Sequence, residues 1–123
     1  MGLDQYAYVN SQEDTRNEMA YWRKHPNLQG WMEQLWESKG RPLEHMSDPE
    51  YFDGSFNCIP VELTMEDIEK LEKDILYGGL PGTTGFFFGE DSDTYYKEQD
   101  LKFVMDAKQE IIAGNRVFYS SWW

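Results

Sequence analysis

Residues 64–79 read TMEDIEKLEKDILYGG, and they give the strongest indication of fold class in the chain because they carry a complete helix signal. Thr64 and Asp67 have the spacing of a capping box, in which each side chain accepts a hydrogen bond from the other residue's backbone N–H. Apolar residues then recur at the spacing of one helix face: Met65, Ile68, Leu71 and Ile75. Because the glycine pair 78–79 stops the pattern, the sequence predicts a helix over residues 65–77.

Two more helices are predicted, one on each side of this segment. Residues 28–38 place several apolar side chains on one face: Leu28, Trp31, Met32, Leu35 and Trp36. Asn27 is the expected N-cap of this helix, and Gly40 is the expected stop. Residues 95–113 form the third predicted helix, with these side chains along one face: Leu101, Val104, Met105, Lys108 and Ile112.

Short alternating or aromatic runs predict strands between the helices. The expected strands are Leu3–Val9, Met19–Lys24, Phe56–Leu63, Gly85–Gly89 and Val117–Trp122. Pro60 indicates an edge position for the third of them, because proline cannot donate to a neighbouring strand. No regular βαβ repeat is visible, so we expect an α+β fold with a mixed or antiparallel sheet of about four to five strands and three helices. A chain of 123 residues fits a single domain, residues 1–123.

The composition is strongly acidic, with 23 acids against 11 bases and a formal net charge of −12. This charge argues against direct binding to nucleic acid or to an anionic membrane, and it favours cationic partners. The longest apolar run is residues 86–88, far too short to span a membrane. With one cysteine, Cys58, and no signal-peptide pattern at the N-terminus, the expected location is the cytoplasm.

The segment Trp22, Arg23, Lys24 and His25 concentrates possible cations beside an aromatic ring in an acidic protein. Arginine offers a bidentate fork for a carboxylate or phosphate, and Trp22 offers a stacking face, so the segment is a candidate site for an anionic ligand. The alternative is that Arg23 and Lys24 pair with nearby acids while the aromatic side chain belongs to the core.

Residues 80–89 read LPGTTGFFFG and form the second candidate for anion binding. The backbone N–H groups and hydroxyls of Gly82, Thr83, Thr84 and Gly85 are suited to wrap an anion. No Gly-Lys-Ser/Thr follows, so the stretch is not a P-loop. The alternative is a turn that leads into a buried aromatic strand.

Metal and cofactor sites are not expected. Asp91 and Asp93 have the spacing of half a calcium loop, but the position that should hold its bidentate glutamate is Lys102, and capping of the following helix explains them equally well. His25 and His45 are the only histidines, and with Cys58 they would have to converge from distant points to bind zinc. We expect Cys58 to be buried in an apolar strand.

The C-terminal residues 118–123 read FYSSWW, which is unusually apolar for the end of a chain. Trp122 and Trp123 are costly to leave in water, so we expect this segment either to join the sheet as a strand or to mediate homo-oligomer formation or partner binding.

The chain resembles a family of short phage and bacterial proteins of unknown function. The resemblance is carried by Met1-Gly2-Leu3-Asp4 and Tyr6, Trp22-Arg23-Lys24 with Trp31, Leu80-Pro81 with Gly85-Phe86-Phe87-Phe88-Gly89, and Tyr119-Ser120-Ser121-Trp122. Some members are loosely labelled phosphoglycerate kinase, but 123 residues are too few for that two-domain enzyme. The chain departs from the pattern at Gln5, where methionine is common, and at Gln29, where histidine is expected.

Three functional hypotheses follow from these observations. The first is a phage-type accessory protein of the host cytoplasm that binds a host protein or a small anionic ligand. The second is a small enzyme acting on a nucleotide or phosphorylated metabolite, with His25 or Asp91 as acid or base. The third is an acidic mimic of a polyanion.

Overall fold

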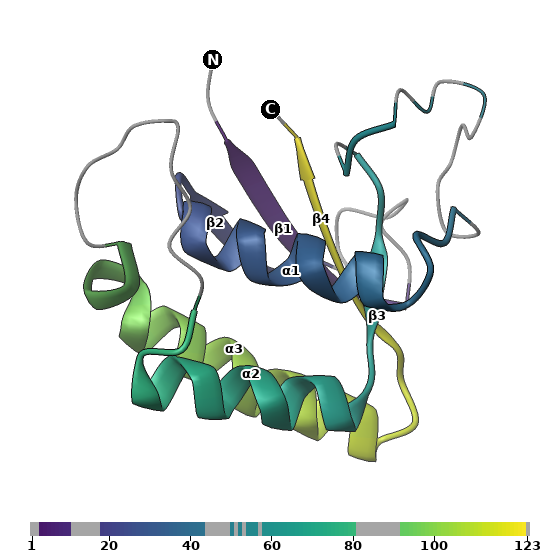
Figure 1. Ribbon diagram of the computed structural model, residues 1–123. Coiled ribbons are helices and arrows are strands. Elements are labelled where there is room, and N and C mark those ends of the chain that lie inside the picture. The colour runs from purple at the N-terminus through teal and green to yellow at the C-terminus, as the bar shows by residue number, and fades with distance from the viewer. Residues whose placement is uncertain are drawn as a thin grey trace.

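The computed structural model describes residues 3–10, 18–43, 50, 52, 54–56, 58–80 and 92–122, with side chains in the last range from Tyr96 onward. This part of the chain forms three α-helices and a four-stranded sheet, the α+β arrangement that the sequence predicts. The elements are β1 (Asp4–Val9), β2 (Glu18–Arg23), α1 (Pro26–Ser38), β3 (Val61–Leu63), α2 (Met65–Tyr77), α3 (Ser92–Ile112) and β4 (Val117–Trp122) (Figure 1). None of the helices described here has the length and apolarity needed to cross a bilayer.

The sheet has the order β2-β1-β4-β3, and every pairing is antiparallel. The C-terminal strand therefore lies inside the sheet, beside the N-terminal strand, with Asp4 opposite Trp122 and Val9 opposite Val117. The expectation that residues 117–122 join the sheet as a strand is confirmed.

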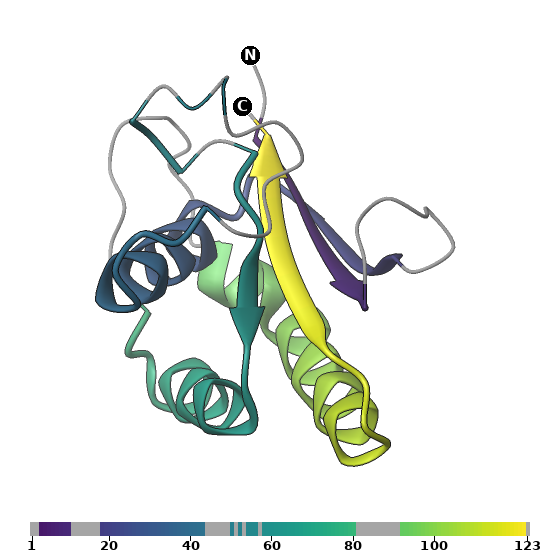
Figure 2. The ribbon, with the colours of Figure 1, turned by 90° about the vertical axis from the view of Figure 1, so that its right-hand side faces the viewer.

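All three helices lie on one face of the sheet (Figure 2). Strand β1 shows the consequence, since Gln5 and Ala7 are buried toward the helices whereas Asp4, Tyr6 and Tyr8 on the other face are only partly buried. A single hydrophobic cluster joins the sheet to the helices, with these side chains among its members: Trp22, Leu28, Met32, Trp36, Phe56, Ile68, Leu71, Phe103, Val104 and Tyr119.

Helix α2 has the predicted bounds, because its signals are local. Thr64 and Asp67 form both hydrogen bonds of the capping box, and Gly78 ends the helix in the left-handed conformation at φ 70°. Helix α1 begins earlier than predicted, at Pro26, whose fixed φ suits the first helical turn. Its N-cap is His25 rather than Asn27.

The predicted apolar face of α3 was right in part. Val104 is buried and Leu101 packs against the core, but Met105 and Ile112 are 59% and 77% exposed. The fully buried positions of the helix are Asp100, Phe103, Val104 and Ala107. The charged Asp100 conceals this stripe in the sequence, because a carboxylate rarely marks a buried position.

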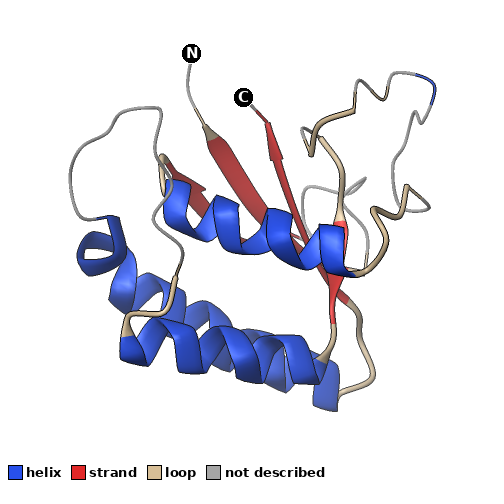
Figure 3. Cartoon of the chain, in the orientation of Figure 1, coloured by secondary structure: helices blue, strands red, loops and turns tan. Residues whose placement is uncertain are grey.

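The third predicted strand is shorter than expected and spans only the residues of β3, directly after Pro60 (Figure 3). Cys58 does not lie buried in a strand: it is exposed and adopts a left-handed conformation at φ 63° in a turn. The predicted strand at residues 85–89 lies outside the residues that the structure describes.

Side chains occupy backbone groups along both edges of the sheet. At the β2 edge, the Tyr96 hydroxyl bonds both the N–H and the carbonyl of Arg23, and the Gln99 amide donates to the carbonyl of Tyr21. At the β3 edge, the Lys39 ammonium donates to the Glu62 carbonyl at 2.8 Å. These contacts oppose extension of the sheet by another strand, which unprotected edges invite.

Candidate functional site

The four residues of the candidate anion site, residues 22–25, divide into an inner pair that faces the core and an outer pair that faces solvent. Trp22 and His25 are fully buried, whereas Arg23 and Lys24 are exposed. Lys24 has φ 61°, and this left-handed residue turns the chain from β2 toward α1. The four neighbouring residues therefore do not share one surface.

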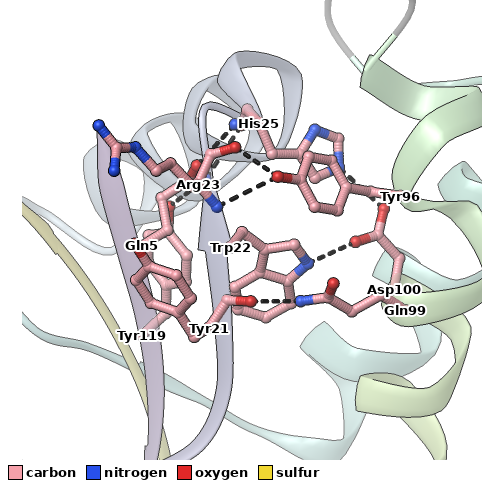
Figure 4. Close-up of polar contacts among 9 residues, drawn as sticks. All are labelled: Gln5, Tyr21, Trp22, Arg23, His25, Tyr96, Gln99, Asp100 and Tyr119. Carbon is pink, nitrogen blue, oxygen red and sulfur yellow. Dashed lines mark hydrogen bonds and ion pairs between the residues drawn. The ribbon is translucent and has the colours of Figure 1, made fainter. Parts of the chain in front are cut away.

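The inner pair meets Asp100 of α3 (Figure 4). One carboxylate oxygen accepts from the Trp22 indole N–H at 2.8 Å, and the other lies 2.8 Å from His25 Nε2. The Tyr96 ring stacks on the imidazole with centroids 4.8 Å apart. Trp22 is thus fixed within the core in this arrangement, and its ring face is not presented to solvent.

A buried hydrogen-bond chain continues from His25 into the sheet. The Gln5 amide donates to the His25 carbonyl at 3.0 Å and to the Tyr119 hydroxyl at 2.9 Å, and that hydroxyl donates to Gln29 Oε1 at 2.6 Å. Burial raises the pKa of Tyr119, so its hydroxyl keeps the proton that it donates. Gln5 and Gln29 therefore meet at one hydroxyl.

Trp22, His25 and Asp100, which we call the buried cluster, come from β2, the start of α1 and α3, and the described residues leave almost none of their surface exposed. His25 and Asp100 are 0% and 1% exposed, so acid or base chemistry there would first require the helices to move. Among the described residues, no three His, Cys, Asp or Glu side chains form a group that would hold a metal ion.

Arg23, one of the outer pair, belongs to the sheet face that the helices leave uncovered, which we call the open face. Strand register places these residues on it: Asp4, Tyr6, Tyr8, Glu18, Tyr21, Arg23, Glu62, Phe118, Ser120 and Trp122. Of these, Phe118 and Ser120 are buried, so the exposed part of the open face lies on β1, β2 and the end of β4. The Tyr6 ring contacts the rings of Tyr21 and Tyr8, with centroids 5.2 and 6.0 Å apart. Trp122 is 60% exposed and Tyr21 is 41% exposed. Aromatic side chains thus cover much of a surface that usually carries polar residues in an antiparallel sheet.

Two charged side chains of the open face, Asp4 and Arg23, differ in the contacts that they make. The Tyr21 hydroxyl donates to Asp4 at 2.7 Å, and this bond raises the pKa of Tyr21 to about 12. Within the described part of the chain, Arg41 and Arg116 form ion pairs with glutamates, whereas Arg23 forms none. Its side chain points away from the buried cluster (Figure 4).

The residues that the sequence analysis assigned to one anion site therefore do not lie on one surface. Arg23 and Lys24 are exposed, Trp22 and His25 are internal, and the glycine-loop candidates Gly82, Thr83, Thr84 and Gly85 lie outside the described residues. Sequence reasoning missed Asp100 and Tyr96 as partners of His25. The helical spacing of Tyr96, Asp100, Phe103 and Ala107 is the signal that identifies their shared face.

Comparison of the chain with models of protein families, with curated proteins and with solved structures finds no match. The functional argument therefore depends on the geometry of the chain itself.

Proposed function

We propose that this protein is a non-catalytic accessory protein that binds a basic segment of a partner protein through its open face. The observation that supports this proposal is an exposed aromatic surface on a sheet whose other face is covered and whose edges are capped. Among the described strands, the two large aromatic side chains that are exposed, Tyr21 and Trp122, both belong to the open face.

The side-chain types on the open face are those that contribute most to protein interfaces. Tyrosine, tryptophan and arginine are enriched among residues that dominate binding energy, because they bury a large area and keep a polar group for orientation. Tyr21, Trp122 and Arg23 combine these types within one cross-strand neighbourhood.

Charge favours a basic partner. The chain carries a net charge of −12, and Asp4 and Glu18 add carboxylates beside the aromatic rings. Lysine and arginine side chains of a partner can form ion pairs with these carboxylates and cation–π contacts with the exposed rings, and both contacts favour binding. Aromatic sheet faces also bind single-stranded RNA by base stacking, but the net charge opposes a polyanion. The resemblance to phage and bacterial proteins points to a host protein as the partner.

The other hypotheses have less support from the geometry. A small-anion site at residues 22–25 was expected to stack its ligand on Trp22, which is buried. An enzyme based on His25 needs access to an imidazole that is buried. Asp91, the other candidate acid or base, lies outside the described residues.

The test is binding of labelled peptides rich in lysine and arginine, compared with matched peptides rich in glutamate. We expect binding of the basic peptides alone, with affinity at least about fivefold lower in Trp122→Ser and Tyr21→Ser, since interface aromatics commonly contribute more than about 1 kcal/mol each. Tyr77→Ser is the matched control, because Tyr77 is a 79% exposed aromatic residue on α2, away from the open face. Equal loss in all three variants, or no loss in the first two, would contradict the proposal.

A further inference from the structure

Two buried side-chain atoms, Gln29 Nε2 of α1 and Ser121 Oγ of β4, form no hydrogen bond within the described part of the chain. Gln29 is 7% exposed and Ser121 is 1% exposed, so bulk solvent does not satisfy these atoms either. Buried polar atoms in native proteins nearly always have a partner, because an unpaired atom keeps the full cost of losing its water. We infer that Gln29 Nε2 and Ser121 Oγ bind one ordered water molecule, which joins helix α1 to strand β4. This inference is independent of the open face.

The hydroxyl group of Tyr119 brings the two atoms into one neighbourhood. It donates to Gln29 Oε1 at 2.6 Å, and Nε2 is the other polar atom of that amide group. Burial raises the pKa of Tyr119, whereas contacts with Gln5 and Ser121 lower it, so the Ser121 side chain lies beside the phenol although its hydroxyl group forms no hydrogen bond there. Ser121 also lies opposite Gln5 in the register of β1 and β4, and Gln5 donates to the Tyr119 oxygen at 2.9 Å. One small molecule therefore reaches both unpaired atoms.

Reversal of the Gln29 amide group does not remove the need for a partner. With nitrogen and oxygen exchanged, Nε2 would donate to the Tyr119 hydroxyl group, and Oε1 would become the buried atom that has no bond. In either orientation the amide group leaves one polar atom unpaired, so the neighbourhood needs a further molecule with hydrogen-bonding capacity.

Water suits these partners better than an ion does. A metal cation is excluded because the Gln29 nitrogen is a hydrogen-bond donor. An anion would accept from both atoms, but the Asp100 carboxylate is close enough to raise the pKa of Tyr119, and its charge repels a second buried anion. A water molecule accepts from Gln29, bonds the Ser121 hydroxyl group and donates to the Tyr119 oxygen, which among the described residues accepts only from Gln5. Buried water usually forms about three hydrogen bonds, so these partners suffice.

The water continues the buried hydrogen-bond chain to the C-terminal end of β4. The bonds through Gln5, Tyr119 and Gln29 already join β1, β4 and α1. Ser121 is the next residue of β4 on the same face as Tyr119, and its carbonyl accepts from the Cys58 N–H at 2.8 Å. That bond fixes the backbone of Ser121, and the water fixes its side chain, so the end of β4 is held against α1.

The first test is a crystal structure of the unaltered protein at a resolution that shows ordered water. We expect one peak of electron density within hydrogen-bond distance, about 2.7–3.2 Å, of both Gln29 Nε2 and Ser121 Oγ. The inference is overturned if no such peak is present, if the density belongs to an ion or a larger molecule, or if the two side chains bond each other directly.

The second test is the melting temperature of Ser121→Ala, in which the water loses one partner. We expect a fall of about 4 °C, the shift that loss of one hydrogen bond produces in a chain of this size. If Ser121 Oγ bound nothing, its removal would relieve an unpaired group, and the melting temperature would stay constant or rise.

Ser120→Ala is the matched control on the same strand, because Ser120 belongs to the open face and its hydroxyl group is not one of the unpaired buried atoms. It should cause a smaller shift than Ser121→Ala. An unchanged or raised melting temperature for Ser121→Ala, or an equal fall in the two variants, would overturn the inference.

Discussion

At the scale of single residues, Asp100 links α3 to the junction between β2 and α1, which is distant in the sequence. Its carboxylate contacts Trp22 at the end of β2 and His25 at the start of α1, 78 and 75 residues away. A buried carboxylate is stabilised only when its oxygens have such donors. The contacts therefore fix where the chain leaves the sheet and enters the first helix.

We expect Asp100→Asn to lower the free energy of unfolding by about 3 kcal/mol, because one amide group cannot accept from both ring N–H groups and leaves a buried donor unpaired. Urea denaturation measures this loss. Asp106→Asn is the control on the same helix, since it removes an exposed ion pair with Lys102 and should change stability by less than about 0.5 kcal/mol. Similar values for the two variants would show that the buried network is not a major source of stability.

Tyr21 and Asp4 give a second residue-scale prediction. The hydrogen bond to Asp4 is the main reason that the pKa of Tyr21 is raised to about 12 from its ordinary value of 10. A raised pKa means that this bond stabilises the fold below pH 10 and that the contribution is lost as the pH rises from 10 to 12. Asp4→Asn should return the pKa toward 10, which carbon-13 NMR of labelled tyrosine detects. An unchanged titration would assign the shift to burial instead.

At the scale of elements, the start of α2 is linked to the segment after α1. Asp67 accepts from the Thr64 backbone and from the Lys39 ammonium, which also donates to the edge of β3. Thr64→Ala should therefore destabilise the protein by about 1 kcal/mol, the usual contribution of an N-cap. Thr64→Ser keeps the cap hydroxyl and should retain most of the stability, so equal losses would point to the methyl group.

The same contacts predict a pH dependence. Burial raises the pKa of Asp67, but hydrogen bonds from Lys39 and Thr64 outweigh burial and hold the pKa below its ordinary value of 3.8. The stabilisation is complete above that value and is lost as the pH falls through the pKa of the folded protein. The stability difference between the unaltered protein and Asp67→Asn should therefore narrow on acidification below pH 4, as urea denaturation at several pH values measures. A difference that stays constant would contradict this assignment.

The side chains that bond the backbone at the β2 edge of the sheet predict when the protein will associate with itself. Tyr96→Phe combined with Gln99→Ala removes the side-chain partners of the outward-facing backbone of β2 while keeping the ring that stacks on His25. We expect this variant to associate as its concentration rises, because an uncapped edge accepts another strand. Light scattering at high salt measures the association, and Gln109→Ala, an exposed change on the same helix, should remain unchanged.

At the scale of the whole molecule, local signals in the sequence predicted more than long-range ones. Helix α2 was predicted from its cap, its spacing and its glycine stop, all within 16 residues. The packed face of α3 was predicted only at Leu101 and Val104, because the rest of it depends on Asp100 meeting partners from β2 and the start of α1. The open face depends on strand order, since Trp122 joins Tyr6 and Tyr21 only because β4 lies beside β1.

The net charge of −12 acts on the whole chain, and it competes with the local ion pairs. The described pairs between lysine or arginine and acids are Lys39–Asp67, Arg41–Glu37, Lys102–Asp106, Lys108–Glu72 and Arg116–Glu62. All are partly or largely exposed, and such pairs contribute only about 0–1 kcal/mol each. Twenty-three acids against 11 bases leave many carboxylates that repel one another in the compact state.

Salt screens both effects, so its influence on stability shows which of them is larger. We expect the melting temperature to rise as NaCl increases from about 0.01 M to about 0.2 M, over which the Debye length falls from about 30 Å to below 10 Å and the repulsion is screened. The rise should level off once screening is complete, whereas a general salting-out effect would continue to grow with concentration. A fall in melting temperature would mean that the ion pairs outweigh the repulsion, and it would weaken the charge argument for a basic partner.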